Sequence, residues 1–222
     1  MDEKKYTAIV FGASGLTGHF VTELLIADPR YDHIKLFIRK ELNFPSDKVK
    51  QYVFNSDKLD VVASEVTGNH LFCCLGTTIK KAGSREVFFN TDHGLVERIA
   101  QIASFNKVES FVVISSLGAN DHSRNFYLNT KGKMEESIKT FSFNNLSIVR
   151  PSMLMGIRRE RRPLEEVSKV LSKVVIPFMV GSMRKYRPIH AEIVARAMIK
   201  LANKPKGIYT LESDKIEQLV ND

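Results

Sequence analysis

The stretch Tyr6-Thr-Ala-Ile-Val-Phe-Gly12-Ala-Ser-Gly15-Leu-Thr-Gly18 decides the fold of this chain. Its first half is a short β-prone run, and its glycines stand directly before a segment with helical spacing of apolar residues. Gly12 permits a tight turn after a strand, Gly15 lets backbone amides approach a pyrophosphate, and Gly18 lets a helix pack closely on the strand. The amides and the positive end of that helix can then hold the anion. The stretch therefore predicts a dinucleotide-binding turn, with an ordinary glycine-rich turn as the alternative.

Short β-rich runs alternate with helical patterns along most of the chain. Strands are predicted at 6–11, 34–39, 51–54, 70–75, 110–115, 146–149 and 207–211, and helices at 16–27, 84–105 and 126–141. Such alternation is typical of right-handed βαβ units, in which helices cover both faces of a parallel sheet. We therefore expect an α/β fold with a doubly wound parallel sheet, the Rossmann fold, in one domain of residues 1–222.

The alternation stops after Pro151. Residues 158–187 hold two prolines, many basic residues and a helical pattern at 165–175, without a clear strand. We expect a small C-terminal substrate lobe, or lid, at 156–187 within the same domain. A helix at 191–203 should then pack back on the sheet, before a last strand and a short helix.

Composition narrows the class of protein. The 222 residues are 43% hydrophobic and 26% charged, which suits one buried core and excludes a disordered chain. We see no apolar run long enough for a membrane span and no apolar signal segment, so we expect a cytoplasmic protein without a membrane partner. Cys73 and Cys74 are neighbours in an apolar run and should be reduced core residues. The histidines lack metal-ligand spacing, so no metal site is expected.

The formal charge of +8 requires that an anionic partner be considered. Between 156 and 187, nine Lys and Arg stand against three Glu, so most of the surplus is local. The basic run at 158–162 of this segment contains Glu160 and lacks the interleaved aromatic residues of a nucleic-acid surface, so we do not expect nucleic acid as a partner. We expect the small-molecule substrate, or the phosphates of the cofactor, to be anionic. The oligomeric state is left open.

Basic residues end the second predicted strand, at Arg39 and Lys40. An acidic residue at this place bonds the ribose 2′-hydroxyl of NAD, whereas a basic residue accommodates the 2′-phosphate of NADP. Because Arg39 can fork two hydrogen bonds onto a phosphate, NADP(H) is favoured over NAD(H). The alternative is a pair of solvated surface charges.

Tyr127 and Lys131 lie one helical turn apart, in the segment that follows the fifth predicted strand. The pKa of a phenol is about 10 in water, and a neighbouring ammonium favours the phenolate. The pair is therefore a candidate for proton transfer, and Lys131 could also bond the nicotinamide ribose. Tyr31 and Lys35 share the spacing but run into a strand, which separates their side chains.

Two serines, Ser115 and Ser116, end the fifth predicted strand at the edge where ligands of such sheets bind. A hydroxyl there can hydrogen-bond a substrate carbonyl oxygen as charge develops on it. In an extended strand the two side chains point to opposite faces, and the sequence does not decide between them, although Ser116 is nearer the loop. The alternative is a serine pair that caps the turn, with Tyr127 on an ordinary helix surface.

Together these motifs and Arg150-Pro151 resemble the short-chain dehydrogenase/reductase superfamily, in its atypical single-domain branch. The strings Cys73-Cys-Leu-Gly-Thr-Thr78, Ser116-Leu-Gly-Ala-Asn120 and Arg161-Arg-Pro163 are similar to the Tat-interacting oxidoreductase group. The resemblance spans nearly the whole chain.

The resemblance implies further roles along the cofactor. It implies that Ser14, Gly15, Leu16 and Thr17 wrap the pyrophosphate, with Arg39 and Lys40 at the 2′-phosphate. It places Leu75 and Gly76 along the adenosine half or the bridging ribose, Leu154 against the nicotinamide and Arg162 on the cofactor. Tyr127 is the implied proton donor or acceptor and Lys131 its partner. The sequence departs from many relatives at Asn55, where they carry an Asp that meets the adenine amine, and the Asn that completes their catalytic set is not assigned.

The function expected from these residues is that of an NADP-dependent oxidoreductase, which moves a hydride between nicotinamide and a carbonyl or alcohol carbon. The second reading is a non-catalytic NADP(H)-sensing regulatory or interaction protein, because fold does not fix function. The third is an enzyme like the sugar-nucleotide epimerases and dehydratases, which usually needs a larger C-terminal domain.

Overall fold

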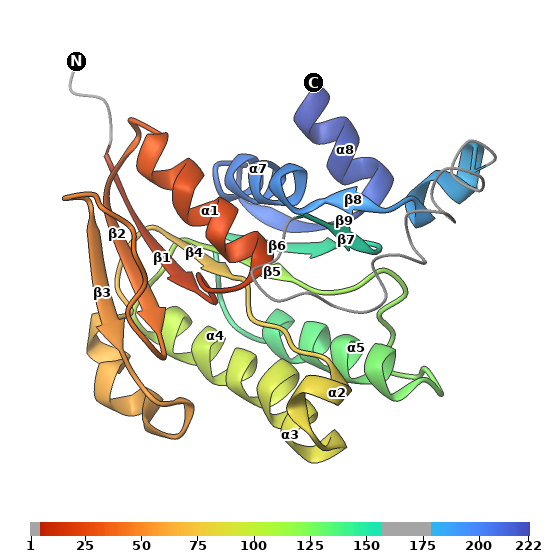
Figure 1. Cartoon of the computed structure of the whole chain (residues 1–222), viewed down its shortest axis with the longest axis horizontal. Coiled ribbons are helices and arrows are strands. Elements are labelled where there is room, and N and C mark those ends of the chain that lie inside the picture. The colour runs from red at the N-terminus through yellow and green to blue at the C-terminus, as the bar shows by residue number, and fades with distance from the viewer. Residues whose placement is uncertain (1–4, 157–178) are drawn as a thin grey trace.

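The sheet is parallel throughout and has seven strands in the order β3-β2-β1-β4-β5-β6-β9. A computed structural model describes residues 5–156 and 179–222 of the chain (Figure 1). The strands are β1 (Tyr6–Phe11), β2 (Tyr31–Ile38), β3 (Val49–Val53), β4 (His70–Cys73), β5 (Ser110–Ile114), β6 (Asn145–Arg150) and β9 (Gly207–Glu212). The doubly wound parallel sheet predicted from the sequence is confirmed.

Helices cover both faces of this sheet (Figure 1). On one face lie α1 (Leu16–Ala27), α7 (Ala191–Ala202) and α8 (Ser213–Asn221), over a core that includes Val10 and Phe72. On the other lie α4 (Leu95–Phe105), α5 (Phe126–Lys139) and the 3-10 helix η1 (Ser56–Glu65), over a core that includes Phe11 and Phe111. Successive residues of a strand therefore enter opposite cores, as a sheet buried on both faces requires.

The helix predicted at 84–105 is confirmed, with a π turn inside it. The segment runs through α3 (Arg85–Phe89), the π turn η2 (Asn90–Gly94) and α4, and the backbone is right-handed helical at both junctions. The hydroxyl of Ser84 caps α3 by accepting a hydrogen bond from the Val87 amide. A short helix α2 (Ile79–Ala82) precedes α3. The π turn directs the Asp92 side chain into the interior of the protein, where it is fully buried.

The region after Pro151 contains strands that the sequence did not indicate. β7 (Leu154–Met155) pairs in parallel with β8 (Ile189–His190), which leads directly into α7. A 3-10 helix η4 (Gly181–Tyr186) precedes β8. The helix predicted at 165–175, and most of the predicted lobe at 156–187, lie outside the described residues.

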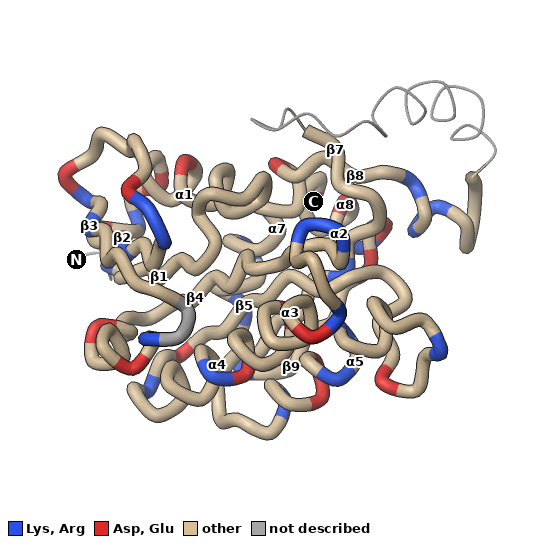
Figure 2. Tube along the Cα trace, turned by 60° about the horizontal axis from the view of Figure 1, so that its bottom comes forward, with Lys and Arg blue, Asp and Glu red and all other residues tan. Residues whose placement is uncertain are grey.

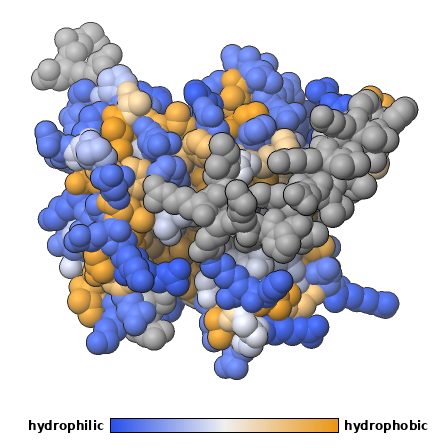
Figure 3. Space-filling model, viewed as in Figure 1, coloured by the Kyte–Doolittle hydropathy of each residue, from blue (hydrophilic) through white to orange (hydrophobic). Residues whose placement is uncertain are grey.

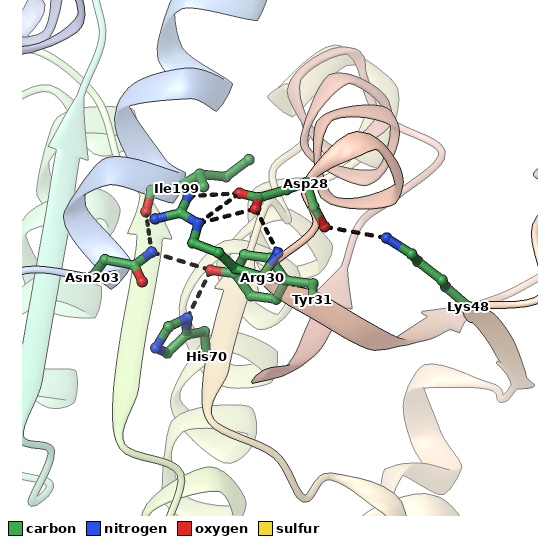
Figure 4. A network of polar contacts seen from close by, with 7 residues as sticks. All are labelled: Asp28, Arg30, Tyr31, Lys48, His70, Ile199 and Asn203. Carbon is green, nitrogen blue, oxygen red and sulfur yellow. Dashed lines mark hydrogen bonds and ion pairs between the residues drawn. The ribbon is translucent and has the colours of Figure 1, made fainter. Parts of the chain in front are cut away.

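The amino edge of the sheet is held by a buried polar contact (Figure 4). The hydroxyl of Tyr31, at the start of β2, lies 2.8 Å from Nδ1 of His70, at the start of β4. The amide of Asn203 donates to the same hydroxyl at 3.3 Å. Burial raises the pKa of Tyr31. The contact joins two strands to the end of α7, at the edge opposite the one where ligands of such sheets bind.

The surface carries dispersed charge and small apolar areas. Lys and Arg are spread over the described part of the chain rather than gathered on one face (Figure 2). Apolar residues on the face shown in Figure 3 form separate areas among hydrophilic ones. Among the described residues, no helix is long and apolar enough to cross a membrane.

Candidate active site

The glycine turn joins β1 to α1 at the point where the strand order reverses between β1 and β4. Gly12 has a φ of 85°, and a Cβ there would lie 2.7 Å from the carbonyl carbon and oxygen of Cys74. A Cβ on Gly18 would overlap the carbonyl oxygen of Gly12. Both positions therefore exclude any larger residue, as the spacing predicts.

The start of α1 fits a pyrophosphate. Its N-cap is Gly15, which offers no side-chain hydrogen bond to the first-turn amides. Those amides have no acceptor within the helix, and they lie at its positive end. The hydroxyl of Thr17 is buried without a hydrogen-bond partner among the described residues, while Ser14 is exposed beside it. The turn thus holds donors that an anion would satisfy.

Arg39 and Lys40 directly follow β2, which pairs with β1 as far as Phe11. Both side chains are exposed, and neither forms an ion pair with a described residue. They stand at the same edge of the sheet as the glycine turn and present two positive charges there.

The loop after β4 lies on the other side of the glycine turn. β4 ends at Cys73, so Leu75 and Gly76 lie in this loop rather than in the strand predicted at 70–75. Burial raises the pKa of the Cys73 thiol to about 12, so Cys73 is an inert core thiol at neutral pH. The amide of Thr77 donates to Oδ2 of Asp92 at 2.9 Å, which fixes the loop against η2.

Tyr127 and Lys131 occupy one face of α5. Asn125 caps this helix by accepting hydrogen bonds from the amides of Tyr127 and Leu128. The Tyr127 ring is half-buried against Phe88, with 5.5 Å between ring centroids, and its hydroxyl makes no hydrogen bond to a described residue. Its oxygen is thus available to a substrate.

Lys131 is buried and stays charged. Its Nζ lies 2.7 Å from Oδ1 of Asp92, and the two side chains are 2% and 0% exposed. Burial opposes the charged form, but the neighbouring Asp92 and Tyr127 outweigh this and raise the pKa of Lys131 above its ordinary value.

The two candidate serines have different surroundings. The buried hydroxyl of Ser115 donates a hydrogen bond to the carboxylate of Glu135 on α5. The same carboxylate accepts a hydrogen bond from Nε of Arg150 at 3.0 Å. Ser116 is half-buried, and its hydroxyl has only a 3.4 Å contact with the carbonyl of Leu117. Only Ser116 therefore has a hydroxyl that a ligand could engage without breaking a buried contact.

The loop after the serines is packed tightly on α5. The amide of Leu117 donates to the carbonyl of Pro151 at 3.0 Å. A Cβ on Gly132 would overlap the backbone of Asn120 and Asp121. Gly132, next to Lys131, thus lets this loop approach the helix that carries Tyr127.

Two residues implied by the resemblance lie beyond β6. Leu154, in β7, is half-buried and packs on the core beneath α1 and α7. A Cβ on Gly156, which follows β7, would lie 2.9 Å from Cδ1 of Leu16. The end of β7 therefore lies against Leu16, the first residue of α1 after the glycine turn. Arg162 lies outside the described residues.

Sequence reasoning missed Asp92, Glu135 and Gly132. Glu135 could have been found, because it follows Tyr127 and Lys131 at four-residue spacing and so shares their helix face. Asp92 gave no such signal, because its position depends on the π turn and its partner belongs to another helix.

Comparison with known proteins agrees with this geometry. Residues 12–205 match a family described as NAD(P)H-binding. The chain is 33% identical over 167 residues to "Protein HTATIP2" of Rattus norvegicus, covering 73% of this chain and 69% of that protein. It is 31% identical over 218 residues to "Protein FMP52-2, mitochondrial" of Scheffersomyces stipitis, covering 96% and 92%. The resemblance to the Tat-interacting oxidoreductase group is confirmed.

Solved structures share the fold. A UDP-N-acetylglucosamine 4-epimerase from Methanobrevibacter ruminantium M1 superposes with a TM-score of 0.71 at 14% identity, covering 98% of this chain and 81% of its own. Vestitone reductase from alfalfa gives a TM-score of 0.65 at 16% identity, covering 93% and 77%. At such identities the likeness shows a shared Rossmann fold.

The expectation of a cytoplasmic location is wrong. It is contradicted by the relatives from Scheffersomyces stipitis, Meyerozyma guilliermondii and Saccharomyces cerevisiae, which are named as mitochondrial proteins. The expectation rested on a search for an apolar secretory segment, and targeting to mitochondria does not depend on such a segment.

Proposed function

The chain belongs to the NAD(P)H-binding family, and from this membership we propose that it is an NADP(H)-dependent oxidoreductase acting on a carbonyl or alcohol. The observation that carries the proposal is the pairing on α5 of an available phenol, Tyr127, with a buried ammonium, Lys131. A protein that only senses the cofactor has no need of a phenol held beside a buried cation.

Each residue has a defined task in carbonyl reduction. NADP(H), when bound, supplies or accepts the hydride. Tyr127 donates its proton to the carbonyl oxygen, and the Lys131 ammonium stabilises the phenolate that remains. Ser116 donates a hydrogen bond to the same oxygen as charge develops on it. The alcohol direction uses the same groups with Tyr127 as the base.

A single substitution tests the role of the phenol. Tyr127→Phe should abolish turnover of a panel of neutral and carboxylate-bearing carbonyls with NADPH, yet leave NADPH affinity within about fivefold, because one neutral hydrogen bond is worth about 1 kcal/mol. Tyr209→Phe is the matched control, since Tyr209 lies on the edge strand β9 and donates to the carbonyl of Pro205. Unchanged turnover in Tyr127→Phe would reject Tyr127 as the proton donor, whereas the absence of turnover in the wild-type chain would favour the sensing function.

We also propose NADP(H) rather than NAD(H), supported by the two exposed cations after β2. Arg39→Ala should weaken NADPH binding by about 10- to 100-fold, because hydrogen bonds to charged groups contribute about 1.5–3 kcal/mol. NADH binding should be unchanged. Arg196→Ala, on the surface of α7, is the control. Equal losses for both cofactors would assign Arg39 to another role.

A further inference from the structure

The connection between β2 and β3 carries the two cations proposed to select NADP(H). Residues 39–48 join these parallel strands without a helix, although such connections usually contain one. The strands β1 and β2 pair with Phe11 opposite Phe37, so Arg39, two residues on, comes level with the glycine turn. The path of this connection therefore decides where the charges of Arg39 and Lys40 stand.

Gln51 holds this connection against the sheet. It is the third residue of β3 and lies opposite Leu36 of β2. Its side-chain amide donates a hydrogen bond to the carbonyl of Leu42 at 2.8 Å and accepts one from the amide of Leu42 at 2.9 Å. Both backbone groups of Leu42 are thus paired with one side chain, as a neighbouring strand would pair them. Glutamine suits this position because its side chain both donates and accepts.

Two further contacts tie the same connection to α1. The Phe44 side chain is 9% exposed, and the centroid of its ring lies 5.1 Å from that of His19, the fourth residue of α1. Toward β3, Nζ of Lys48 donates to the carbonyls of Ile26 and Asp28 at 3.0 and 3.2 Å, and Figure 4 shows the contact with Asp28. The connection is therefore packed along the helix that begins at the glycine turn.

The hold on Leu42 is the one nearest to the two cations. Leu42 comes two residues after Lys40, and the side chains of Arg39 and Lys40 form no ion pair with a described residue that could place them. Their position therefore depends on the backbone that Gln51 fixes. A loop that must become ordered during binding lowers the affinity for its ligand, whereas a preformed loop avoids this cost.

We propose that Gln51 is a positioning residue for the choice of cofactor. By holding Leu42, it keeps Arg39 and Lys40 at the edge of the sheet, where they receive the 2′-phosphate of NADP(H). This inference rests on the proposed preference for NADP(H), and it adds a residue outside the glycine turn and the two cations. NAD(H) has no phosphate at this position, so the binding of NAD(H) should be indifferent to Gln51.

Amide hydrogen exchange of the full chain, measured by NMR without cofactor, tests the hold on the loop. Gln51→Leu keeps a side chain of similar size but removes its donor and its acceptor. The Leu42 amide should then exchange at least about tenfold faster than in the wild-type chain. Tyr52→Phe is the matched control, because Tyr52 is the next residue of β3 and its hydroxyl donates to Glu65 at 2.7 Å. It should leave the exchange of the Leu42 amide within about twofold.

Titration with NADPH and with NADH measures the consequence for binding. Gln51→Leu should weaken NADPH binding about tenfold and leave NADH binding within about twofold, because only NADPH carries the 2′-phosphate. A purely structural role would instead weaken the binding of both cofactors alike, and that result overturns the inference. Gln51→Met, an unbranched apolar variant of similar length, should behave in the same way and replaces Gln51→Leu if that variant does not fold. Tyr52→Phe should leave both affinities unchanged.

A background without the two cations shows whether Gln51 acts through them. In a chain carrying Arg39→Ala and Lys40→Ala, Gln51→Leu should change NADPH affinity by less than about twofold, because the loop then has no charge to place. A tenfold loss in that background, or wild-type exchange of the Leu42 amide in Gln51→Leu, overturns the inference and leaves the preference for NADP(H) standing. The same holds if NADPH affinity is unchanged although the Leu42 amide exchanges faster. Equal wild-type affinities for NADPH and NADH, with no effect of Arg39→Ala, reject the preference and the inference together.

Discussion

Replacing Arg150 by Met removes the countercharge of a buried carboxylate beneath the candidate active site. Arg150 is the last residue of β6, and its Nε and Nη2 lie 3.0 and 2.5 Å from the two oxygens of Glu135 on α5. The hydroxyl of Ser115 donates to the same carboxylate. The Glu135 side chain is 1% exposed, whereas that of Arg150 is 23% exposed. The two partners therefore lose different amounts when the other is removed.

The exposures set the expected order of the costs. Arg150→Met leaves a buried carboxylate with one neutral donor, Ser115, and breaking a buried pair in this way costs about 3–5 kcal/mol. Glu135→Gln leaves the charge on the partner that water can reach, and the new amide oxygen can still accept from Ser115. Its cost should be about 1.5–3 kcal/mol, the worth of hydrogen bonds to a charged group. The double variant holds neither charge and should be more stable than Arg150→Met alone.

Urea unfolding at neutral pH, followed by circular dichroism, measures these free energies of unfolding. The control is Arg196→Met, because Arg196 pairs with Glu192 on the surface of α7 with both side chains about half exposed, and such pairs contribute about 0–1 kcal/mol. If Glu135→Gln costs as much as Arg150→Met, or if the two costs simply add in the double variant, the buried carboxylate does not depend on Arg150 and the reasoning fails.

Three further predictions concern the glycine turn, the buried Cys73 thiol and the contact between β6 and the end of α7. Gly12→Ala should lower NADPH affinity at least about tenfold and lower the melting temperature. The reason is that the new Cβ would lie 2.7 Å from the Cys74 carbonyl, at a backbone φ that disfavours side chains. A wild-type NADPH affinity in fluorescence titration would contradict this prediction. Burial raises the pKa of the Cys73 thiol from 9.0 to about 12. The unfolded chain therefore loses this proton first as the pH rises, so the free energy of unfolding is unaffected below pH 9 and falls between pH 9 and pH 12. The part of the loss that comes from Cys73 should be about 2 kcal/mol by about pH 10.5. In urea unfolding, Cys73→Ala should therefore lose about that much less stability than the wild-type chain, and the loss that remains includes that of Cys74, whose pKa burial also raises. Asn145→Ala should cost about 1–3 kcal/mol in urea unfolding, because its amide donates to the carbonyls of Leu201 and Lys204; a cost below about 0.5 kcal/mol would mean that water replaces it.

Much of the fold follows from patterns that are local in the sequence. The strand β5 (Ser110–Ile114) is buried at every position, and a parallel strand covered on both faces reads as a continuous apolar run. The glycine turn was equally readable, since Gly12 and Gly18 each meet backbone where a Cβ would stand. In both cases the pattern is contained in a short stretch of the sequence, even though the backbone that Gly12 meets belongs to the distant Cys74.

The short strands after β6 could not be predicted, because they have no local pattern in the sequence. β7 (Leu154–Met155) and β8 (Ile189–His190) are two residues each, which is too short for a period to show. Their pairing joins positions that are far apart in the chain. The π turn inside the helix predicted at 84–105 gave no signal either, because the apolar residues of α4 at Val96, Ile99 and Ala103 keep helical spacing after it.

The two buried carboxylates mark where reading a site from sequence ends. Glu135 follows Tyr127 and Lys131 at four-residue intervals, and Ile138 on the same side of α5 is also buried. A carboxylate on a buried helix face requires a cation or several hydrogen-bond donors. The sequence could therefore have predicted that Glu135 has such a partner. Which cation it meets is decided in three dimensions, because Lys131 lies on the same helix face as Glu135 and yet pairs with Asp92 from η2. The charge state of the site is therefore set by a tertiary contact, which no spacing along α5 contains.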